Sequence, residues 1–268
     1  MVIDIHAHAF PDGLAARAMN ELIHTLEGDY LPFSDGTVAG LIEKMDAWGI
    51  DVSVIQPVVT KQAQVRGANE WAAAIRSDRL VCFGGIYPHG DSYKEDIDLV
   101  VGLGLRGLKF HAEYQDFTLD DPHMLRIYDY ALSKGLIILH HAGYDPSFLP
   151  PFKTSPRQFR NVIDAMRGGI VIAAHLGGHA QWEDVERYLA GTDIYLDTSM
   201  GFEYYPRELF LRIVESHGAD KILFGSDAPW SNAKTEIEHL RSLPITENEK
   251  KAILGENAKR ILALSGLS

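Results

Sequence analysis

Two histidines near the start of the chain are the clearest candidates for chemistry. His6 and His8 stand at the end of a short apolar run, Val2–Ala7, whose residue types favour a β-strand. Side chains two residues apart on a strand project to the same face. Two imidazoles placed in this way can bind one metal ion, with each nitrogen about 2.0 to 2.1 Å from it.

Polar residues of the same kind follow several later apolar runs. These residues are Lys109 and His111, His140 and His141, His175, and Asp227. A strand that is otherwise apolar has no packing reason to end in histidine or aspartate, so we expect these side chains to meet in a site. Neutral nitrogen ligands with one carboxylate suit zinc, and also manganese, iron or cobalt. We therefore predict one divalent metal ion, with zinc as the first choice.

The elements that must position these residues follow a regular alternation. Eight runs with strand character are Val2–Ala7, Val52–Val58, Val81–Tyr87, Gly107–Phe110, Leu136–Leu139, Ile170–Ala174, Ile194–Leu196 and Ile222–Phe224. Eight segments with helical spacing lie between or after them: Val38–Trp48, Glu70–Arg76, Tyr93–Val101, Pro122–Ser133, Pro156–Met166, Trp182–Leu189, Pro206–Ser216 and Lys234–Leu243. This alternation predicts a (β/α)8 TIM barrel, with the site at the C-terminal face of the strands. The rival fold, a doubly wound open sheet, lacks support because no glycine-rich dinucleotide motif follows the first run.

Two segments depart from the regular alternation. A long excursion, residues 14–37, follows the first run, and a loop with four prolines, residues 145–156, follows the fifth. In a barrel both rise over the C-terminal face, where active sites are built. The sequence contains no linker-like stretch, so we expect residues 1–268 to form a single barrel domain.

The composition limits the partners of this protein. Its 25 lysines and arginines against 37 aspartates and glutamates give a net charge of −12, which disfavours nucleic acid and anionic membranes. The single cysteine, Cys82, cannot form an intrachain disulfide, and the chain has no leader-like start and no long apolar run. We expect a cytoplasmic protein with a small-molecule substrate. The sequence leaves the oligomeric state open, a homodimer included.

Five stretches of the sequence resemble the strand-end motifs of the amidohydrolase superfamily. They are DIHAHAFPD, LRGLKFHAEYQDF, LHHAGYDP, IAAHLGG and LFGSDAPW. The resemblance is to the amidohydrolase-related family that also contains ACMS decarboxylase-like enzymes, and it runs over nearly the whole chain. It implies a metal held by His6, His8, a histidine of the fifth strand and Asp227. It also implies that His175 contacts the water activated by the metal.

Two adjacent histidines compete for the ligand position on the fifth strand. Neighbouring strand residues point to opposite faces, so only one of His140 and His141 can be the ligand. The family pattern of an apolar residue, histidine, a small residue and glycine matches His141, Ala142 and Gly143. We therefore favour His141, and expect His140 to be a hydrogen-bonded histidine of the core.

Three further residues are candidates for binding the substrate. Lys109 is a cation that can bind a substrate carboxylate; its alternatives are a carbamylated lysine bridging two metals, as in some members of the superfamily, or a partner for a nearby acid. His111 shares a face with Lys109 and either lines the pocket or supports it from behind. Arg157, just after the proline-rich loop, can hold an anionic substrate or be a solvated residue at the start of a helix.

The favoured function is metal-dependent hydrolysis of a C–N or C–O bond in a small substrate that can be anionic. In this hypothesis Asp227 is both ligand and acid/base, and His175 orients the water or stabilises the developing charge. The alternative is a metal-dependent non-oxidative decarboxylase, in which Lys109 or Arg157 secures the carboxylate and His175 acts as base. A metal-independent lactonase and a non-catalytic barrel are weaker alternatives, since neither needs the full set of metal-type residues.

Overall fold

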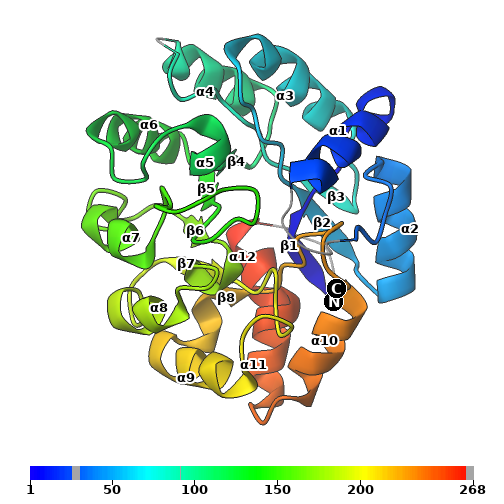
Figure 1. Ribbon diagram of the computed structural model, residues 1–268, viewed down its shortest axis with the longest axis vertical. Coiled ribbons are helices and arrows are strands. Elements are labelled where there is room, and N and C mark those ends of the chain that lie inside the picture. Colours follow the sequence, from blue (N-terminus) through cyan, green and yellow to red (C-terminus); the bar gives the residue numbers. More distant parts are fainter. Residues whose placement is uncertain (26–30, 91, 264–268) are drawn as a thin grey trace.

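Short strands and helices alternate along the chain, as Figure 1 shows. The computed structural model describes residues 1–25, 31–90 and 92–263. The strands in this part are β1 (Ile3–Ala7), β2 (Val52–Ile55), β3 (Leu80–Cys82), β4 (Gly107–Phe110), β5 (Ile137–His140), β6 (Val171–Ala173), β7 (Tyr195–Asp197) and β8 (Ile222–Leu223). The α-helices are α1 (Asp12–Thr25), α2 (Val38–Trp48), α3 (Val65–Ala74), α4 (Tyr93–Gly102), α5 (Ala112–Gln115), α6 (Pro122–Ser133), α7 (Pro156–Val162), α8 (Trp182–Tyr188), α9 (Arg207–His217), α10 (Ala233–Ser242), α11 (Glu247–Lys251) and α12 (Asn257–Ile261).

The strands close into a ring in the order of the sequence. Parallel pairing joins β1, β2 and β3 into one sheet and β4 to β8 into another. Single bridges fill both gaps: Gly84 pairs with Leu108 between β3 and β4, and Ala7 pairs with Ala228 between β8 and β1. The predicted (β/α)8 barrel is therefore confirmed, with the helices on the outside of the ring (Figure 1).

The inside of the barrel is an apolar core. Its buried strand and strand-end residues are Ile3, Ile5, Val52, Val54, Phe83, Ile137, Leu139, Ile172, Ala174 and Leu223. Ala258, Ile261 and Leu262, from α12 and the residue after it, pack into the same cluster and close the barrel at one end. Aliphatic side chains thus fill this end, and the candidate ligands His6, His8 and Asp227 lie toward the end where the strands finish.

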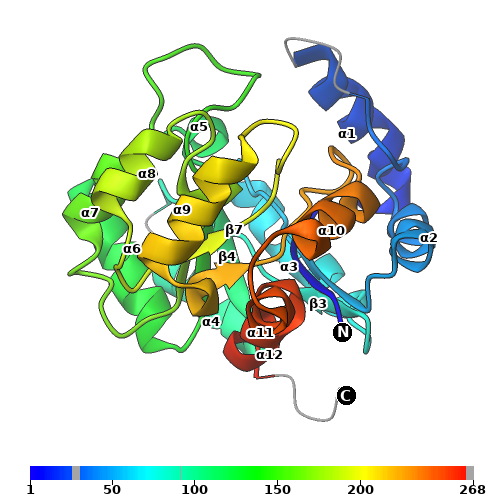
Figure 2. The same ribbon diagram turned by 90° about the horizontal axis from the view of Figure 1, so that it is seen from below.

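The opposite end of the barrel carries the long excursions. Figure 2 shows α1 and the loop before α7 rising at one end, while the chain begins at the other. The two excursions meet where the Thr25 and Ser147 hydroxyls are 3.2 Å apart. The 14–37 excursion contains most of α1 and the segment that leads to α2. Its residues 26–30 lie outside the described residues.

Two predictions about single features of the chain can be compared with this fold. None of the helices in the described ranges is both long and apolar enough to cross a membrane. Cys82 is a free, fully buried thiol at the end of β3, and burial raises its pKa to about 12. A thiol of this kind is inert, so Cys82 is a structural residue of the core.

Candidate metal centre

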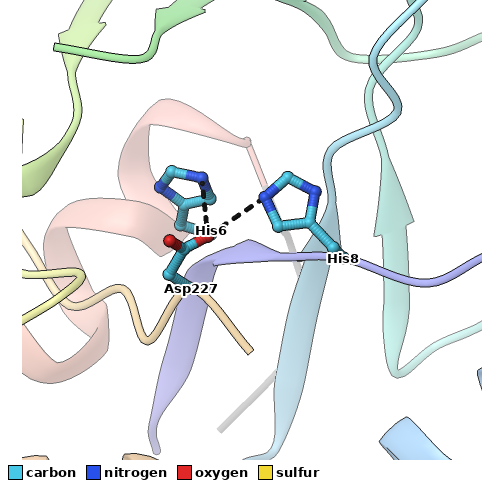
Figure 3. A group of neighbouring side chains, drawn as sticks. All are labelled: His6, His8 and Asp227. Carbon is cyan, nitrogen blue, oxygen red and sulfur yellow. Dashed lines mark ion pairs between the residues drawn. The ribbon is translucent and has the colours of Figure 1, made fainter. Parts of the chain in front are cut away.

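Three side chains from the first and last strands converge at the mouth of the barrel (Figure 3). His6 belongs to β1, His8 follows it, and Asp227 follows β8. Oδ1 of Asp227 is 3.1 Å from Nε2 of His8 and 3.4 Å from Nε2 of His6. Ligand atoms of all three residues lie within 4.8 Å of one another, so a single ion can reach them all.

The other nitrogen of each imidazole is already held by the protein. Nδ1 of His8 donates to the carbonyl of Gln56, at 2.8 Å, which leaves the lone pair on Nε2. Nδ1 of His6 lies 3.0 Å from Oδ2 of Asp197. Metal-binding histidines are usually fixed in this way by a carboxylate or carbonyl behind them. The donor set therefore fits a divalent ion in both chemistry and tautomer.

Asp227 is held as a carboxylate by the histidines around it. Burial alone raises its pKa, but the electrostatic interaction with His6 and the hydrogen bond from His8 outweigh this and keep the pKa well below the ordinary value. Its backbone has φ of 60°, a conformation that non-glycine residues seldom adopt. The amide of Asp227 donates to the His6 carbonyl at 2.7 Å, which ties the strained turn to β1.

His175 occupies the neighbouring part of the mouth, directly after β6. Its backbone is also left-handed, with φ of 56°, and its amide donates to Oδ1 of Asp197 at 3.1 Å. Its ring lies between Nδ1 of His141, at 3.0 Å, and the hydroxyl of Ser199, at 2.9 Å. Burial, and then the interaction with His141, lowers the pKa of His175 well below its ordinary value, so its imidazole is neutral.

Lys109 brings a positive charge into the same mouth. The side chain is 1% exposed, and its Nζ donates to Nε2 of His6 at 2.8 Å, a hydrogen bond that an ion bound to this nitrogen would replace. Burial lowers its pKa to about 8, although Asp227 and Asp197 act in the opposite direction. At neutral pH the amine is therefore still mostly an ammonium ion, placed next to the candidate ligands.

His111 and His141 lie side by side at the ends of β4 and β5. Their ring centroids are 4.1 Å apart and their planes differ by 17°. Nε2 of His111 is 3.1 Å from Oδ2 of Asp145, a residue of the loop after β5. Burial alone raises the pKa of Asp145, but the hydrogen bond and charge of His111 bring it down to about 2.

Two residues with predicted roles, His140 and Arg157, remain to be placed in the structure. His140 is fully buried between aromatic rings, stacked on Phe110 and edge-on to Tyr128. Its two ring nitrogens have no hydrogen-bond partner within the described chain, so the predicted hydrogen bonds are wrong, and burial lowers its pKa to about 3. The aromatic packing takes the place of those bonds. Arg157 is exposed in the first turn of α7, apart from the buried cluster.

Several residues of the site were not singled out from the sequence. Asp197 contacts His6, His175 and Ser199 with its two oxygens, and the carbonyl of Gln56 fixes His8. Asp197 ends an apolar run, Ile194–Leu196, so the strand-end criterion applied to that run would have found it. Gln56 acts through its backbone, and no sequence signal marks such a contact.

The fold and this site together define a (β/α)8 barrel with a histidine and carboxylate centre where its strands end. The sequence matches the amidohydrolase family over residues 3–264, and the chain belongs to that family. It is therefore an enzyme of the amidohydrolase superfamily, whose members use a divalent metal. No curated protein sequence matches the chain significantly.

Solved structures with the same fold include enzymes with two kinds of reaction. The 5-carboxyvanillate decarboxylase of Sphingomonas paucimobilis has a TM-score of 0.73 at 18% identity, covering 98% of this chain and 99% of that chain. A dihydroxybenzoic acid decarboxylase of Polaromonas, with bound manganese, has a TM-score of 0.70 at 16% identity, covering 99% and 98%. A Pseudomonas putida protein assigned as a 2-pyrone-4,6-dicarboxylic acid hydrolase has a TM-score of 0.67 at 16% identity, covering 100% and 98%.

Proposed function

We propose that this protein is a metal-dependent decarboxylase of a small, planar carboxylic acid. The observation that carries the proposal is the buried ammonium group of Lys109, 2.8 Å from Nε2 of His6 at the base of the mouth. An ammonium group at this mouth, in addition to its interaction with Asp227 and Asp197, can donate a charge-assisted hydrogen bond to a substrate carboxylate. The decarboxylases of Sphingomonas and Polaromonas, which share the fold, support this choice over hydrolysis.

His6, His8 and Asp227 are the residues we propose as the core of the metal centre, with His141 as the further ligand that the family resemblance implies. A divalent ion bound there polarises a substrate oxygen and stabilises negative charge on it. Manganese is a candidate equal to zinc, since the same donor types suit both and the Polaromonas enzyme binds manganese.

The side chains of the mouth supply the remaining steps. Lys109 holds and neutralises the carboxylate of the substrate. When the C–C bond breaks, its electron pair stays on the substrate carbon, CO2 leaves, and one proton must reach that carbon. His175 and Asp227 are the groups we propose to relay that proton from solvent to the carbon, because both lie at this mouth, His175 buried and Asp227 with a side chain 13% exposed.

Aromatic rings around the mouth support a planar substrate. Tyr114 is edge-on to Phe148 at 4.8 Å and to His111 at 4.6 Å between centroids. On another side, the ring of His179 lies edge-on to Trp182 at 5.4 Å. Rings of this kind pack against the faces and edges of a flat substrate.

Hydrolysis remains the second candidate because Asp227 and His175 are equally placed to move the protons of a water molecule. It also agrees with the fold shared with the 2-pyrone-4,6-dicarboxylic acid hydrolase of Pseudomonas putida. In that reaction Lys109 binds a carboxylate that is not itself removed.

Isotopes distinguish the two reactions. The manganese- or zinc-loaded protein is incubated with a panel of hydroxylated aromatic acids and cyclic esters in D2O and, separately, in water labelled with 18O. Decarboxylation releases CO2 and places one deuterium on the carbon that lost it. Hydrolysis places 18O in the product without releasing CO2, and this result would overturn the decarboxylase proposal.

A further inference from the structure

One more histidine of the mouth, His179, has no chemical role in the reaction described above. It lies between β6 and α8, is 4% exposed, and its ring centroid is 6.0 Å from that of His175. Burial lowers its pKa to about 4, although the charges of Asp227 and Asp145 act in the opposite direction. The imidazole is therefore uncharged at neutral pH and lies within reach of the acids of the mouth.

The backbone of His179 is held by the segment that follows β5. Its amide donates to the carbonyl of Ala142 at 2.8 Å, and its carbonyl accepts the amide of Tyr144 at 3.0 Å. The residue between these two must be glycine, because a Cβ at Gly143 would come within 2.4 Å of the His179 nitrogen. Ala180, the next residue, is left-handed with φ of 56°, a strain that persists only where the surroundings fix the backbone. The position of His179 is therefore rigid.

Aromatic side chains fix the plane of the His179 ring. It stacks on Tyr144, with centroids 5.8 Å apart and planes that differ by 19°. Tyr204, which follows β7, lies edge-on at 5.1 Å, and Trp182, at the start of α8, lies edge-on at 5.4 Å. Segments that follow β5, β6 and β7 thus meet at this imidazole. Packing of this kind holds a hydrogen-bonding group in one direction.

Nδ1 of His179 is buried and has no hydrogen-bond partner in the part of the chain that the structure describes. In the candidate ligands, by contrast, Nδ1 of His8 donates to a carbonyl and Nδ1 of His6 faces a carboxylate. Nδ1 of His179 thus has no contact that sets the tautomer of the ring. An uncharged imidazole of this kind can donate to an oxygen or accept from a hydroxyl.

An aromatic wall alone does not explain a histidine at this position. A buried nitrogen without a partner destabilises the folded state, and an apolar ring would fill the same space without that cost. The neighbouring Trp182 shows the usual arrangement, because its indole N–H donates to the carbonyl of His175 at 3.2 Å. A contact with a molecule bound in the mouth accounts for the imidazole of His179.

We propose that the imidazole of His179 determines specificity by forming a hydrogen bond with a hydroxyl or carbonyl oxygen on the ring of the substrate, distinct from the carboxylate that Lys109 holds. The inference rests on the proposed binding of a planar carboxylic acid, and it holds whether that acid is decarboxylated or hydrolysed. The rival interpretation is that His179 only fills the wall of the mouth.

Binding of small acids tests the proposal without turnover. The Mn²⁺-loaded protein is titrated by calorimetry with benzoate and with its 2-, 3- and 4-hydroxy derivatives. In H179F, which keeps an aromatic ring, we expect the affinity for at least one hydroxybenzoate to fall about 10-fold, while the affinity for benzoate stays the same. K109M should weaken the binding of all these acids alike, because it removes the partner of their shared carboxylate. H239Q, at an exposed position of α10, is the control and should bind as the wild type does.

The outcomes separate this inference from the proposed function. Urea unfolding should show H179F to be at least as stable as the wild type, because Nδ1 has no hydrogen bond to lose. If H179F binds every hydroxybenzoate as the wild type does while K109M weakens them all, the role of His179 is overturned and the proposed function stands. If the wild type binds none of the acids, the proposed function fails and this inference fails with it. If H179F does not fold, H179L decides by the same criteria.

Discussion

At the scale of single residues, the side chains behind the candidate ligands matter as much as the ligands. Asp197 is fully buried and holds Nδ1 of His6 at 3.0 Å. The same carboxylate accepts the amides of His175 and Ser199, at 3.1 and 3.0 Å. Asp197 therefore fixes both the ring orientation of His6, a candidate ligand, and the left-handed backbone of His175, a candidate acid/base.

Replacing Asp197 tests this support. We expect the D197N variant to bind the metal ion about 10 to 100 times more weakly, because His6 loses the charge that fixes its tautomer. Titration of the stripped protein with Mn²⁺, followed by calorimetry, measures the affinity. The matched control is D193N, whose carboxylate is 87% exposed in an ion pair with Lys221. An unchanged affinity in D197N would mean that the contact is not needed for metal binding.

Replacing Lys109 tests the carboxylate site. Methionine has a similar length and no charge, so K109M keeps the packing of a side chain that is 1% exposed and removes its ion pair with the substrate. A charged hydrogen bond contributes about 1.5 to 3 kcal/mol, so its loss corresponds to a fall of about 10- to 100-fold in kcat/KM. K234M, at an exposed position of α10, should keep the wild-type value. Equal kcat/KM in K109M and wild type would exclude Lys109 from substrate binding.

Sequence reasoning reached the site residues that carry their own signal. His6, His8 and Asp227 come together as the strand-end criterion predicts, because parallel strands bring their carboxyl ends to one face. The strand-end criterion missed residues that act by supporting other residues. The carbonyl of Gln56 and the aromatic shell of His140 depend on the packing between segments far apart in the sequence.

At the scale of elements, helices with strong signals at both ends were predicted at their observed bounds. Val38–Trp48 and Pro122–Ser133 match α2 and α6, each with a side-chain cap at its start, from Thr37 and Asp121. A left-handed glycine, Gly49 or Gly135, closely follows each helix. Local chemistry fixes such boundaries before tertiary packing acts.

Elements with weaker signals were missed or misplaced. Helix α1 was missed; it buries only Ala15 and Met19, so tertiary packing marks it weakly. Strand β2 ends at Ile55, three residues earlier than predicted, because Pro57 lacks the amide that a longer strand needs. Strand β3 ends before Gly84 and Gly85, which favour a strand poorly.

Helix α10 carries a buried acid whose ionisation should limit stability. Glu236 is 3% exposed, and its Oε2 accepts the amide of Phe202 at 2.9 Å. Burial raises its pKa to about 7 from an ordinary 4.5. The folded protein therefore binds a proton more tightly than the unfolded chain, and stability contributed by this group falls as the pH rises from about 4.5 through 7.

The E236Q variant should remove this dependence. Glutamine has the same shape, keeps an acceptor for the amide of Phe202 and cannot ionise. At pH 8 we expect E236Q to be more stable than wild type by up to about 3 kcal/mol, and the difference should vanish near pH 4.5. Urea unfolding at several pH values measures it. E238Q, at an exposed position of the same helix, is the control, and a pH-independent difference for E236Q would contradict the assigned pKa.

At the scale of the whole molecule, the proposed metal centre joins strands that are far apart in the chain. His6 and His8 belong to the start of the barrel and Asp227 to its end, at the point where Ala7 and Ala228 close the ring by a single bridge. Bound ions should therefore stabilise the closed barrel in addition to their part in the reaction.

Chelation tests this coupling of metal binding and folding. An ion at 100 times its Kd stabilises the folded state by about 2.7 kcal/mol, which corresponds to a rise of about 5 to 10 °C in Tm for a chain of this size. We expect the melting temperature, followed by scanning calorimetry, to fall by that amount on stripping and to recover with Mn²⁺ or Zn²⁺. The H8A variant, which lacks one of the proposed ligands, should show a smaller shift than the wild type. A wild-type Tm that does not respond to saturating metal would show that the ions, if they bind, do not hold the ends of the barrel together.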